Sequence, residues 1–321
     1  MLTMRRATPF RVTKLKQLWR LVRESDAEPL SGQPQIPVVA AAHETAITFI
    51  GHSSFLIQTG GQGLLIDPVF ANRLVVLRRQ RRPGVLIQDL PAVNVVMLTH
   101  AHMDHLNRPS LRAITREMRR RGLAAPIAIV PRSVKDLVRT LGFSAVHELD
   151  WWQPMVHGGL TITATPAKHW GARMFRDTHR GFGGYNIRSA DGPSIWHSGD
   201  TAYFSGFREI GAQLRPDVAL LPIGAYFPDS YRAVHTSPEE ALQAFTDSGA
   251  GWMIPMHYGT FRLGREPMTE PLPRLLAAAD GAGLKENILP LEEGETWVVP
   301  PSAVLPHAPG SLQETWAASG A

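Results

Sequence analysis

Four side chains of the kinds that bind metal ions crowd into a short stretch directly after an apolar run. The run VNVVMLTH, which ends at His100, has the length of a buried strand and continues without a turn signal into AHMDH. We therefore expect His100, His102, Asp104 and His105 on a loop at the end of that strand. Two imidazoles at i and i+2 can converge on one metal ion, while the next two side chains point to a neighbouring position. A polar, His-rich surface loop is the alternative, but so dense a spacing is rarely met by chance.

Three further candidate ligands follow the same rule of position. His169 in PAKHW, Asp200 in HSGD and His257 in PMHYG each come at the end of a strand or strand-like segment. Asp200 is the natural bridging ligand, because a carboxylate has two oxygens to share. The chain contains no cysteine, so thiolate ligands are excluded and any metal must be held by His, Asp and Glu. Such ligands suit two divalent ions, with Zn²⁺ as our expectation and iron or manganese as alternatives.

The pattern of elements predicts two similar halves. Each half shows several short strands followed by helix–strand units. The expected helices cover residues 109–121, 133–142 (ended by Gly142), 204–214 and 237–249. The last of these is the best marked, with Ser237 as N-cap, Pro238 next, Glu240 closing a capping box and Gly249 at the end. Two such halves packed face to face make an α/β protein with a four-layer αββα sandwich.

We divide the chain into an N-terminal extension (1–42), a main domain that carries the candidate ligands (43–300) and a loose tail rich in Pro, Ala, Ser and Gly (301–321). In the extension, Val12, Leu15, Leu18, Trp19 and Val22 recur at helical spacing with basic residues between them. This amphipathic helix either touches an anionic membrane or packs on the body of its own protein. No apolar run reaches the roughly 20 residues that span a bilayer, and no signal peptide is recognisable. We therefore expect a cytoplasmic protein, with peripheral membrane contact as the alternative in which the N-terminal helix does not pack on the body.

Composition narrows the partners without naming them. The chain is 44% hydrophobic and 19% charged, which excludes wholesale disorder, and its net charge of +5 suits an anionic small molecule or lipid. No interleaved basic and aromatic stripe is present, so nucleic acid is not expected. The basic segment RRQRR at 78–82 is either an anion-binding patch or a solvated loop. The oligomeric state stays open.

The order HxHxDH, a later His, GD and a final His resembles the metallo-β-lactamase superfamily. Further blocks resemble the branch of N-acyl-phosphatidylethanolamine-hydrolysing phospholipase D and its bacterial homologues, over about residues 45–299. These blocks are FIGHSSFLIQT, LLIDPVF, ELDWW, PAKHW, GDTAYFSGFREIG, LLPIGAYFP, VHTSPEEA and MHYGTF. The resemblance implies an αββα sandwich with a two-metal site at the edge of the paired sheets.

Residue by residue, the resemblance implies that one metal ion is held by His100, His102 and His169. It places Asp104, His105 and His257 on the second ion and makes Asp200 the bridge. Three more positions match the family pattern, each with a simpler alternative. Asp67 supports the His loop or merely forms a turn before Pro68. His235 donates to a substrate phosphate oxygen or leaving group, or is only a capping or loop residue; His52 orients the site from below and is more structural than catalytic. The other histidines have no ligand context and are expected at surface or structural positions, namely His43, His147, His157, His179, His197 and His307.

The implied reaction is hydrolysis by a hydroxide bound to two metal ions, with Asp104 orienting it and taking up its proton. A phospholipase D-like phosphodiesterase acting on a modified phospholipid is the leading interpretation. A lactonase or another ester or amide hydrolase is the alternative, and a non-catalytic metal-binding regulatory protein is a third. Residues 171–187, with Arg173, Arg176 and Arg180, and residues 74–82 depart from the family pattern. We expect both segments to border the pocket, so that the acyl preference of the lipid enzyme does not carry over and their arginines favour an anionic substrate.

Overall fold

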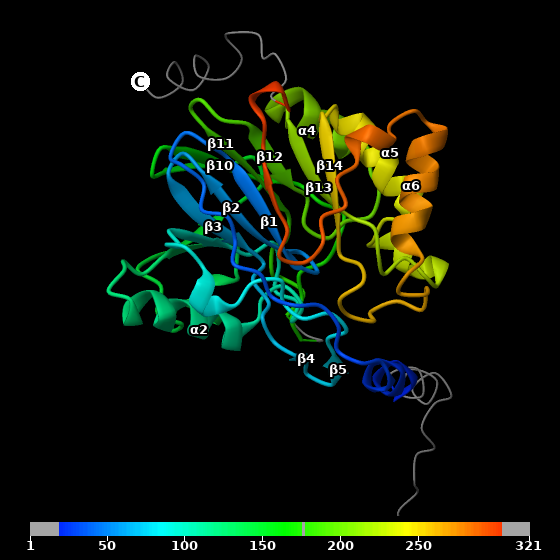
Figure 1. Ribbon diagram of the computed structural model, residues 1–321, viewed down its shortest axis with the longest axis horizontal. Coiled ribbons are helices and arrows are strands. Elements are labelled where there is room, and N and C mark those ends of the chain that lie inside the picture. Colours follow the sequence, from blue (N-terminus) through cyan, green and yellow to red (C-terminus); the bar gives the residue numbers. More distant parts are fainter. Residues whose placement is uncertain (1–18, 175–176, 304–321) are drawn as a thin grey trace, which may run out of the picture.

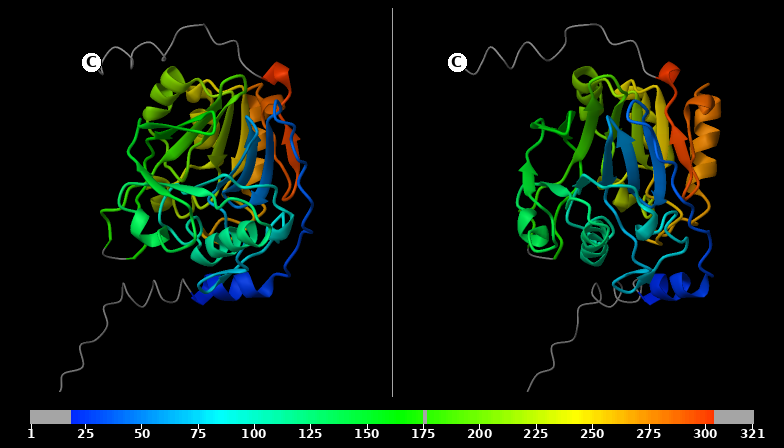
Figure 2. Two further views of the ribbon diagram at one scale, coloured as in Figure 1. Left: turned by 90° about the vertical axis from the view of Figure 1, so that its left-hand side faces the viewer. Right: turned by 60° about the vertical axis from the view of Figure 1, so that its left-hand side comes forward.

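A computed structural model describes residues 19–174 and 177–303 of the 321-residue chain. Two mixed β-sheets pack face to face, and helices cover their outer faces (Figure 1, Figure 2). The first sheet has the strand order β15-β1-β2-β3-β6-β7-β8, and the second has the order β14-β13-β12-β11-β10-β9. This is the predicted four-layer α/β sandwich of the metallo-β-lactamase type. No helix among the described residues is both long and apolar enough to cross a membrane.

Both sheets are built by the same plan. In the first, β1 to β3 are antiparallel and β6 to β8 continue in parallel; their bounds are β1 Ala46–Gly51, β2 Ser54–Thr59, β3 Gln62–Ile66, β6 Val95–Met97, β7 Ile127–Pro131 and β8 Val146–Leu149. In the second, β9 to β12 are antiparallel and β13 and β14 run parallel to β12. Their bounds are β9 Pro154–His157, β10 Leu160–Thr165, β11 Gly184–Ser189, β12 Ser194–His197, β13 Val218–Pro222 and β14 Trp252–Met256. The last strand, β15 (Thr296–Val298), returns to pair with β1.

The strands are apolar on both faces because each sheet is covered on both. In β3, Leu64 and Ile66 point into the core between the sheets, while Leu65 points to the helical layer. The first sheet is covered by α2 (Arg108–Arg120), which buries Leu111 and Ile114. The second sheet is covered by three helices whose apolar sides form one cluster: α4 (Gly206–Leu214), α5 (Pro238–Ser248) and α6 (Pro271–Gly281).

Local signals explain where these helices begin and end. Asn107 caps α2 by accepting a hydrogen bond from the Ser110 backbone N–H. In α5, Ser237 and Glu240 form the predicted capping box, and Gly249 ends the helix in the left-handed conformation. The remaining elements are short: β4 Arg73–Leu74, β5 Leu77–Arg78, α3 Lys135–Val138, and the 3-10 turns η1 Ile87–Asp89, η2 Asp229–Ala233, η3 Lys285–Asn287 and η4 Pro301–Ala303.

The helix predicted over 133–142 is wrong in length, because α3 covers only Lys135–Val138. The chain leaves the helix early since the Leu141 carbonyl accepts a hydrogen bond of 2.6 Å from the Thr115 hydroxyl of α2. Gly142 still adopts a left-handed backbone, but it follows a turn and does not end the helix. The predicted strands at Asp200 and His257 also end sooner, at His197 and Met256, so that both candidate ligands lie on the following loops.

The N-terminal prediction is only partly within the described chain. Residues 12, 15 and 18 of the predicted amphipathic helix lie outside the described residues, whereas residues 19–27 are helical. The tail from residue 304 onward, with His307, also lies outside them.

Candidate metal centre

The predicted site residues come together at one edge of the sandwich. His100, His102, Asp104 and His105 lie on the loop between β6 and α2, as the sequence indicates. The other site residues follow or join strands of both sheets: His52 between β1 and β2, Asp67 after β3, His169 after β10, Asp200 after β12, His235 before α5 and His257 after β14. Because the parallel strands of a sheet end on the same side, their loops meet there.

One group consists of three imidazoles. The Nδ1 atom of His102 lies 2.8 Å from His100 Nε2 and 3.3 Å from His169 Nε2. His169 donates its Nδ1–H to the Val234 carbonyl oxygen, and His100 donates its Nδ1–H to the Thr99 hydroxyl. Both rings therefore direct an Nε2 lone pair at His102, and a proton on His102 can satisfy only one of them. Three convergent imidazole nitrogens are the arrangement of a metal site.

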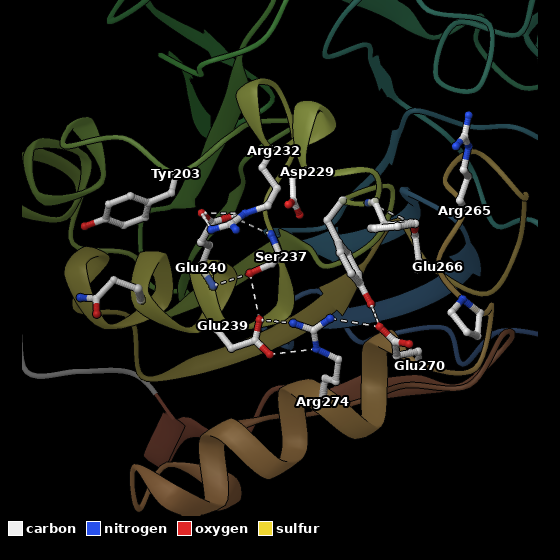
Figure 3. A pocket seen from close by; sticks show the side chains of 14 residues that line it. Tyr203, Asp229, Arg232, Ser237, Glu239, Glu240, Arg265, Glu266, Glu270 and Arg274 are labelled. Carbon is white, nitrogen blue, oxygen red and sulfur yellow. Dashed lines mark hydrogen bonds and ion pairs between the residues drawn. The ribbon is translucent and has the colours of Figure 1, made fainter. Parts of the chain in front are cut away.

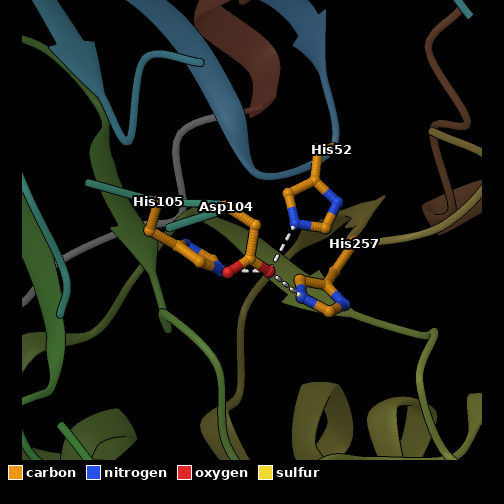
Figure 4. A group of neighbouring side chains, drawn as sticks. All are labelled: His52, Asp104, His105 and His257. Atoms are coloured by element: carbon orange, nitrogen blue, oxygen red, sulfur yellow. Dashed lines mark hydrogen bonds and ion pairs between the residues drawn. The ribbon is translucent and has the colours of Figure 1, made fainter. Parts of the chain in front are cut away.

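The second group mixes imidazoles with a carboxylate (Figure 4). The Oδ2 atom of Asp104 lies 3.6 Å from the Nε2 atoms of both His105 and His257, and 3.1 Å from His52 Nε2. All four residues offer one ligand atom within 4.8 Å of one another. This group can hold a second ion.

Asp200 connects the two groups. Its Oδ2 atom lies 3.0 Å from His257 Nε2 and 3.2 Å from His105 Nε2, and 4.0 Å from His100 Nε2 of the imidazole group. Its Oδ1 atom is buried and has no hydrogen-bond partner among the described residues. One carboxylate thus faces both groups, which is the geometry of a bridging ligand.

Asp67 holds the His loop from behind. It accepts a 2.8 Å hydrogen bond from the Thr99 backbone N–H and bonds of 2.6 Å from the Thr99 hydroxyl and 2.7 Å from His105 Nδ1. The last of these fixes the tautomer of His105 and leaves Nε2 free to bind a metal. Asp67 also adopts a left-handed backbone conformation, with φ of 43°, just before Pro68. The turn and the support of the loop are therefore two properties of the same residue.

The charge balance of the cluster favours cations. Burial works against charge on both carboxylates, but the neighbouring histidines, His105 first, hold the pKa of Asp104 and Asp200 well below the ordinary value. Burial also opposes protonation of His257, but Asp200 and Asp104 raise its pKa to about 9. His169, where burial dominates, has its pKa lowered to about 4. Two charged carboxylates among these imidazoles therefore favour a cation at this place.

Several buried atoms of the cluster have no hydrogen-bond partner among the described residues, as expected of metal ligands. The Nε2 atoms of His105 and His257 and the Oδ1 atom of Asp200 make no hydrogen bond within the described chain. Buried polar atoms are rarely left unpaired, because each costs about 1–3 kcal/mol. Imidazoles with orphaned nitrogens around shared carboxylate oxygens fit two metal ions, and the clusters are consistent with a binuclear site.

His235 lies inside the cluster rather than at its rim. Its Nδ1 atom is 3.8 Å from Asp200 Oδ2, and its ring centre is 5.1 Å from that of His169 and 5.3 Å from that of His257. His235, Asp200 and His257 also form a group that could hold a metal. A capping role is excluded by position, since Ser237 caps α5.

Hydrogen bonds hold His52, on the turn between β1 and β2 of the first sheet, within the cluster. Its backbone carbonyl accepts a 2.8 Å hydrogen bond from the His257 N–H, and its backbone N–H donates to the Thr260 hydroxyl. Burial, together with the neighbouring His257, lowers the pKa of its ring to about 3. A neutral ring can donate from Nε2 to Asp104, which orients that carboxylate.

Several residues of the site escape sequence reasoning. The Trp170 ring lies 4.3 Å from that of His102, and its side chain stays about half exposed, so it forms an apolar wall beside the imidazole group. His197, expected at a surface or structural position, is structural: it is fully buried, accepts a hydrogen bond from Gly199 N–H and donates to the Ser53 carbonyl. It therefore ties the Asp200 loop to the His52 turn. The position of Trp170 directly after a candidate ligand is the one signal that could have identified it.

The arginines of the two departing segments do not act as the sequence suggests. Arg173 donates to the carbonyls of Ala101 and Leu106, and Arg180 pairs with Asp136 and Asp177. Arg79 is buried and donates to backbone carbonyls, while Arg81 pairs with Glu292 and Glu293. Their guanidinium groups already have partners within the protein, which removes the argument that they bind an anionic substrate. Arg176 lies outside the described residues.

A separate cavity of about 590 Å³ lies between α5, α6 and the 226–232 segment (Figure 3). Its walls are tied by ion pairs, notably Arg274 with Glu239 and Glu270, and Arg232 with Glu240. None of the clustered metal ligands lines it. This cavity and the metal-ligand cluster therefore lie in different places, and the ligand cluster defines the site.

Comparison with known proteins agrees with fold and site. The family model described as "Beta-lactamase superfamily domain" matches residues 63–258, so the chain belongs to the metallo-β-lactamase superfamily. An uncharacterized Mycobacterium tuberculosis protein is 37% identical over 290 residues, which cover 82% of this chain and 73% of the relative. N-acyl-phosphatidylethanolamine-hydrolyzing phospholipase D 1 of Caenorhabditis elegans is 31% identical over 272 residues, which cover 78% and 74% of the two chains. The structure of Igni18, a metallo hydrolase of Ignicoccus hospitalis, matches with a TM-score of 0.62 and 27% identity over 80% of this chain and 99% of that one.

The chain is thus a metal-dependent hydrolase of the metallo-β-lactamase fold with a His/Asp metal site. The resemblance to the phospholipase D branch is borne out among its homologues.

Proposed function

We propose that this hydrolase is a phosphodiesterase that cleaves a modified phospholipid in the manner of phospholipase D. One observation carries the proposal: Asp200 Oδ2 faces both ligand groups, in a chain 31% identical to an N-acyl-phosphatidylethanolamine-hydrolyzing phospholipase D. A centre with two cations suits a substrate whose reacting group is an anion, because the cations offset its charge.

His100, His102 and His169 would hold one ion, and Asp104, His105 and His257 the other, with Asp200 shared. Two ions in these positions, which we propose to be Zn²⁺, would activate water as a nucleophile near neutral pH and neutralise charge on the phosphoryl group. Iron or manganese suits the same ligands.

The protein's own side chains have separate tasks in this proposal. Asp104 is the one carboxylate of the cluster with partial access to solvent, at 14% exposure of its side chain, so it is placed to orient an attacking water and accept its proton. His235, with a buried Nδ1 that lacks a hydrogen-bond partner, would bind a phosphate oxygen or donate a proton to the leaving oxygen. The exposed face of Trp170 offers an apolar surface for part of a lipid.

A carbonyl substrate is the second candidate, and one observation favours it. The arginines near the site, Arg173 and Arg180, have partners within the protein and are not free to bind an anionic headgroup. A lactone, ester or amide needs no such recognition, and the same centre could polarise its carbonyl.

Assays with different substrates distinguish the two candidate functions. We would assay the metal-loaded protein with N-acyl-phosphatidylethanolamine, with bis-p-nitrophenyl phosphate and with a lactone panel, each with and without a chelator. The proposal predicts chelator-sensitive release of phosphatidic acid and of nitrophenol, and no lactone opening. Lactone opening without phosphodiester cleavage would overturn it in favour of the second candidate.

A matched pair of variants tests whether the centre performs the reaction. His102→Ala should abolish turnover and lose metal, because it removes the nitrogen on which His100 and His169 converge. His179→Ala removes an exposed histidine outside the clusters and should change neither. A metal-independent rate in His102→Ala equal to that of the wild type would contradict the assignment.

A further inference from the structure

The β4–β5 hairpin carries apolar side chains that nothing in the described chain covers. Val75 and Val76 form its turn, and their side chains are 72% and 42% exposed. Leu74, one residue earlier, is buried with Val69 and Phe261. The base of the hairpin is therefore part of the body, and the apolar tip projects from it.

The backbone at this tip favours a different residue from the one present. Val75 has φ of 56°, in the left-handed region, where Gly, Asn and Asp are the usual residues and a β-branched side chain is a genuine outlier. A turn that served only to reverse the chain would be easier to build with one of those residues. A strained, exposed valine indicates that its apolar side chain is used.

The helix over residues 19–27 packs against this hairpin. Arg73 of β4 pairs with Asp26 at 2.7 Å, and the Gln80 side chain donates to the Ser25 carbonyl at 2.8 Å. Figure 1 and Figure 2 both show the helix, in dark blue, beside β4 and β5 at the same end of the molecule. Trp19, the first described residue of this helix, is 63% exposed. Aromatic and aliphatic side chains are thus offered to the outside from two adjoining elements.

Positive charge accompanies these apolar side chains. Residues 1–28 contain seven basic and three acidic residues, and the first eighteen contain five basic and no acidic ones. On the described surface Arg20 and Arg23 lie on the helix and Arg73 and Arg78 flank the tip, although Arg20 and Arg73 have acidic partners. Exposed Trp and Val beside Arg are typical of surfaces that bind an anionic membrane interface.

A series of side-chain contacts also connects the hairpin to the metal centre. The guanidinium of Arg79, just after β5, lies 4.9 Å from the ring centre of Phe261 and donates to the Val69 and Ala71 carbonyls. The Phe261 ring in turn lies 5.3 Å from the His52 ring, edge to face. A binding partner that fixes the hairpin tip therefore also fixes the position of the sandwich edge that carries the metal centre.

We propose that the Val75–Val76 tip and the helix over residues 19–27 form a docking surface for an anionic lipid bilayer. The valines and Trp19 enter the interfacial region, and Arg23 and Arg78, which have no acidic partner among the described residues, meet the lipid phosphates. This inference goes beyond the proposed reaction and stands whether or not the substrate is a phospholipid.

The test uses the full chain with vesicles of phosphatidylcholine alone or mixed with phosphatidylglycerol. We compare the wild type with the double variant Val75→Asn/Val76→Asn, because Asn accepts a left-handed backbone and so preserves the turn. Val156→Asn is the matched control, since Val156 on β9 is 73% exposed. In cosedimentation, the wild type and the control should bind the mixed vesicles in preference to phosphatidylcholine, and the double variant should bind about tenfold more weakly or worse.

Each other outcome overturns the docking surface. Equal vesicle binding by the double variant, or no vesicle binding by the wild type, would exclude it. A concentration-dependent dimer that the double variant abolishes, without vesicle binding, would assign the tip to a second copy of the chain. Hydrolysis of soluble bis-p-nitrophenyl phosphate keeps the two proposals apart: the double variant should retain it, whereas its absence in the wild type would count against the phosphodiesterase only.

Discussion

The two ligand groups of the metal centre differ in the contacts that orient their ligands. In the imidazole group, the rings donate to neutral acceptors, the Thr99 hydroxyl and the Val234 carbonyl. In the mixed group, the imidazoles contact carboxylates: Asp67 accepts from His105, and Asp104 and Asp200 face His257. The pKa of His169 is accordingly lowered, mainly by burial, whereas the carboxylates raise that of His257 despite burial.

This contrast predicts two unequal metal sites. A divalent cation gains more from a site that already contains carboxylates than from one built of neutral rings alone. The mixed group should therefore bind its ion more tightly, and the imidazole group should lose its ion first to a chelator. Asp200 couples the two, because one of its oxygens faces both groups.

The largest effect is expected from removing that shared carboxylate. Asp200→Ala should lower the metal content from two ions towards none. Turnover should fall by about 10²–10³-fold or more, which is the usual cost of losing one preorganised group that stabilises charge. Metal analysis and steady-state kinetics measure both. A variant that keeps two ions would show that Asp200 is not the bridge.

Single-ligand variants should distinguish the two groups. His169→Ala removes a nitrogen from the imidazole group and should leave one tightly held ion, whereas His257→Ala should remove the ion of the mixed group. Metal analysis after dialysis against a weak chelator gives the stoichiometry of each variant. If both variants retained the same single affinity, the proposed inequality of the sites would be wrong.

Asp67→Asn tests the support behind the mixed group. The amide keeps the shape of the side chain but removes the charge that accepts the His105 Nδ1–H bond. Outer partners of this kind typically account for 10–100-fold in metal affinity or activity, so we expect a loss of about that size, confined to one ion. Titration of the metal-free variant with Zn²⁺ measures it, and unchanged affinity at both sites would reduce Asp67 to a turn residue.

The smallest effect is expected from Arg173, which holds the His loop without touching a metal-ligand atom. Arg173→Ala removes hydrogen bonds to the carbonyls of Ala101 and Leu106, at the two ends of that loop, and leaves buried acceptors unpaired. Unfolding free energy should fall by about 1–3 kcal/mol, and metal affinity of both groups should weaken together. Denaturant unfolding measures the first; Arg180→Ala, on the same segment but paired with Asp136 and Asp177, is the control expected to leave metal affinity unchanged.

Sequence reasoning predicts the fold and the cluster well because their signals are local. HxHxDH after an apolar strand, and the capping box of Ser237 and Glu240, depend on neighbours a few residues away. The helix at 133–142 fails because a contact with Thr115, far along the chain, competes with it.

The contacts of the arginines also depend on residues far along the chain. Their partners, such as the Ala101 carbonyl for Arg173 and Asp136 for Arg180, are brought to them only by the folded chain. Charge can be counted in a sequence, but whether a charge is free for a ligand depends on tertiary contacts. The exposure of Val75 at the hairpin tip likewise depends on tertiary contacts and cannot be predicted from the sequence.

The most direct test of this account is calorimetric titration of the metal-free wild-type chain with Zn²⁺. Two ions per chain, the tighter one lost in His257→Ala and the weaker one lost in His169→Ala, is the predicted result. A single site, or two sites that these variants leave unchanged, would contradict the binuclear centre assigned to these histidines and Asp200.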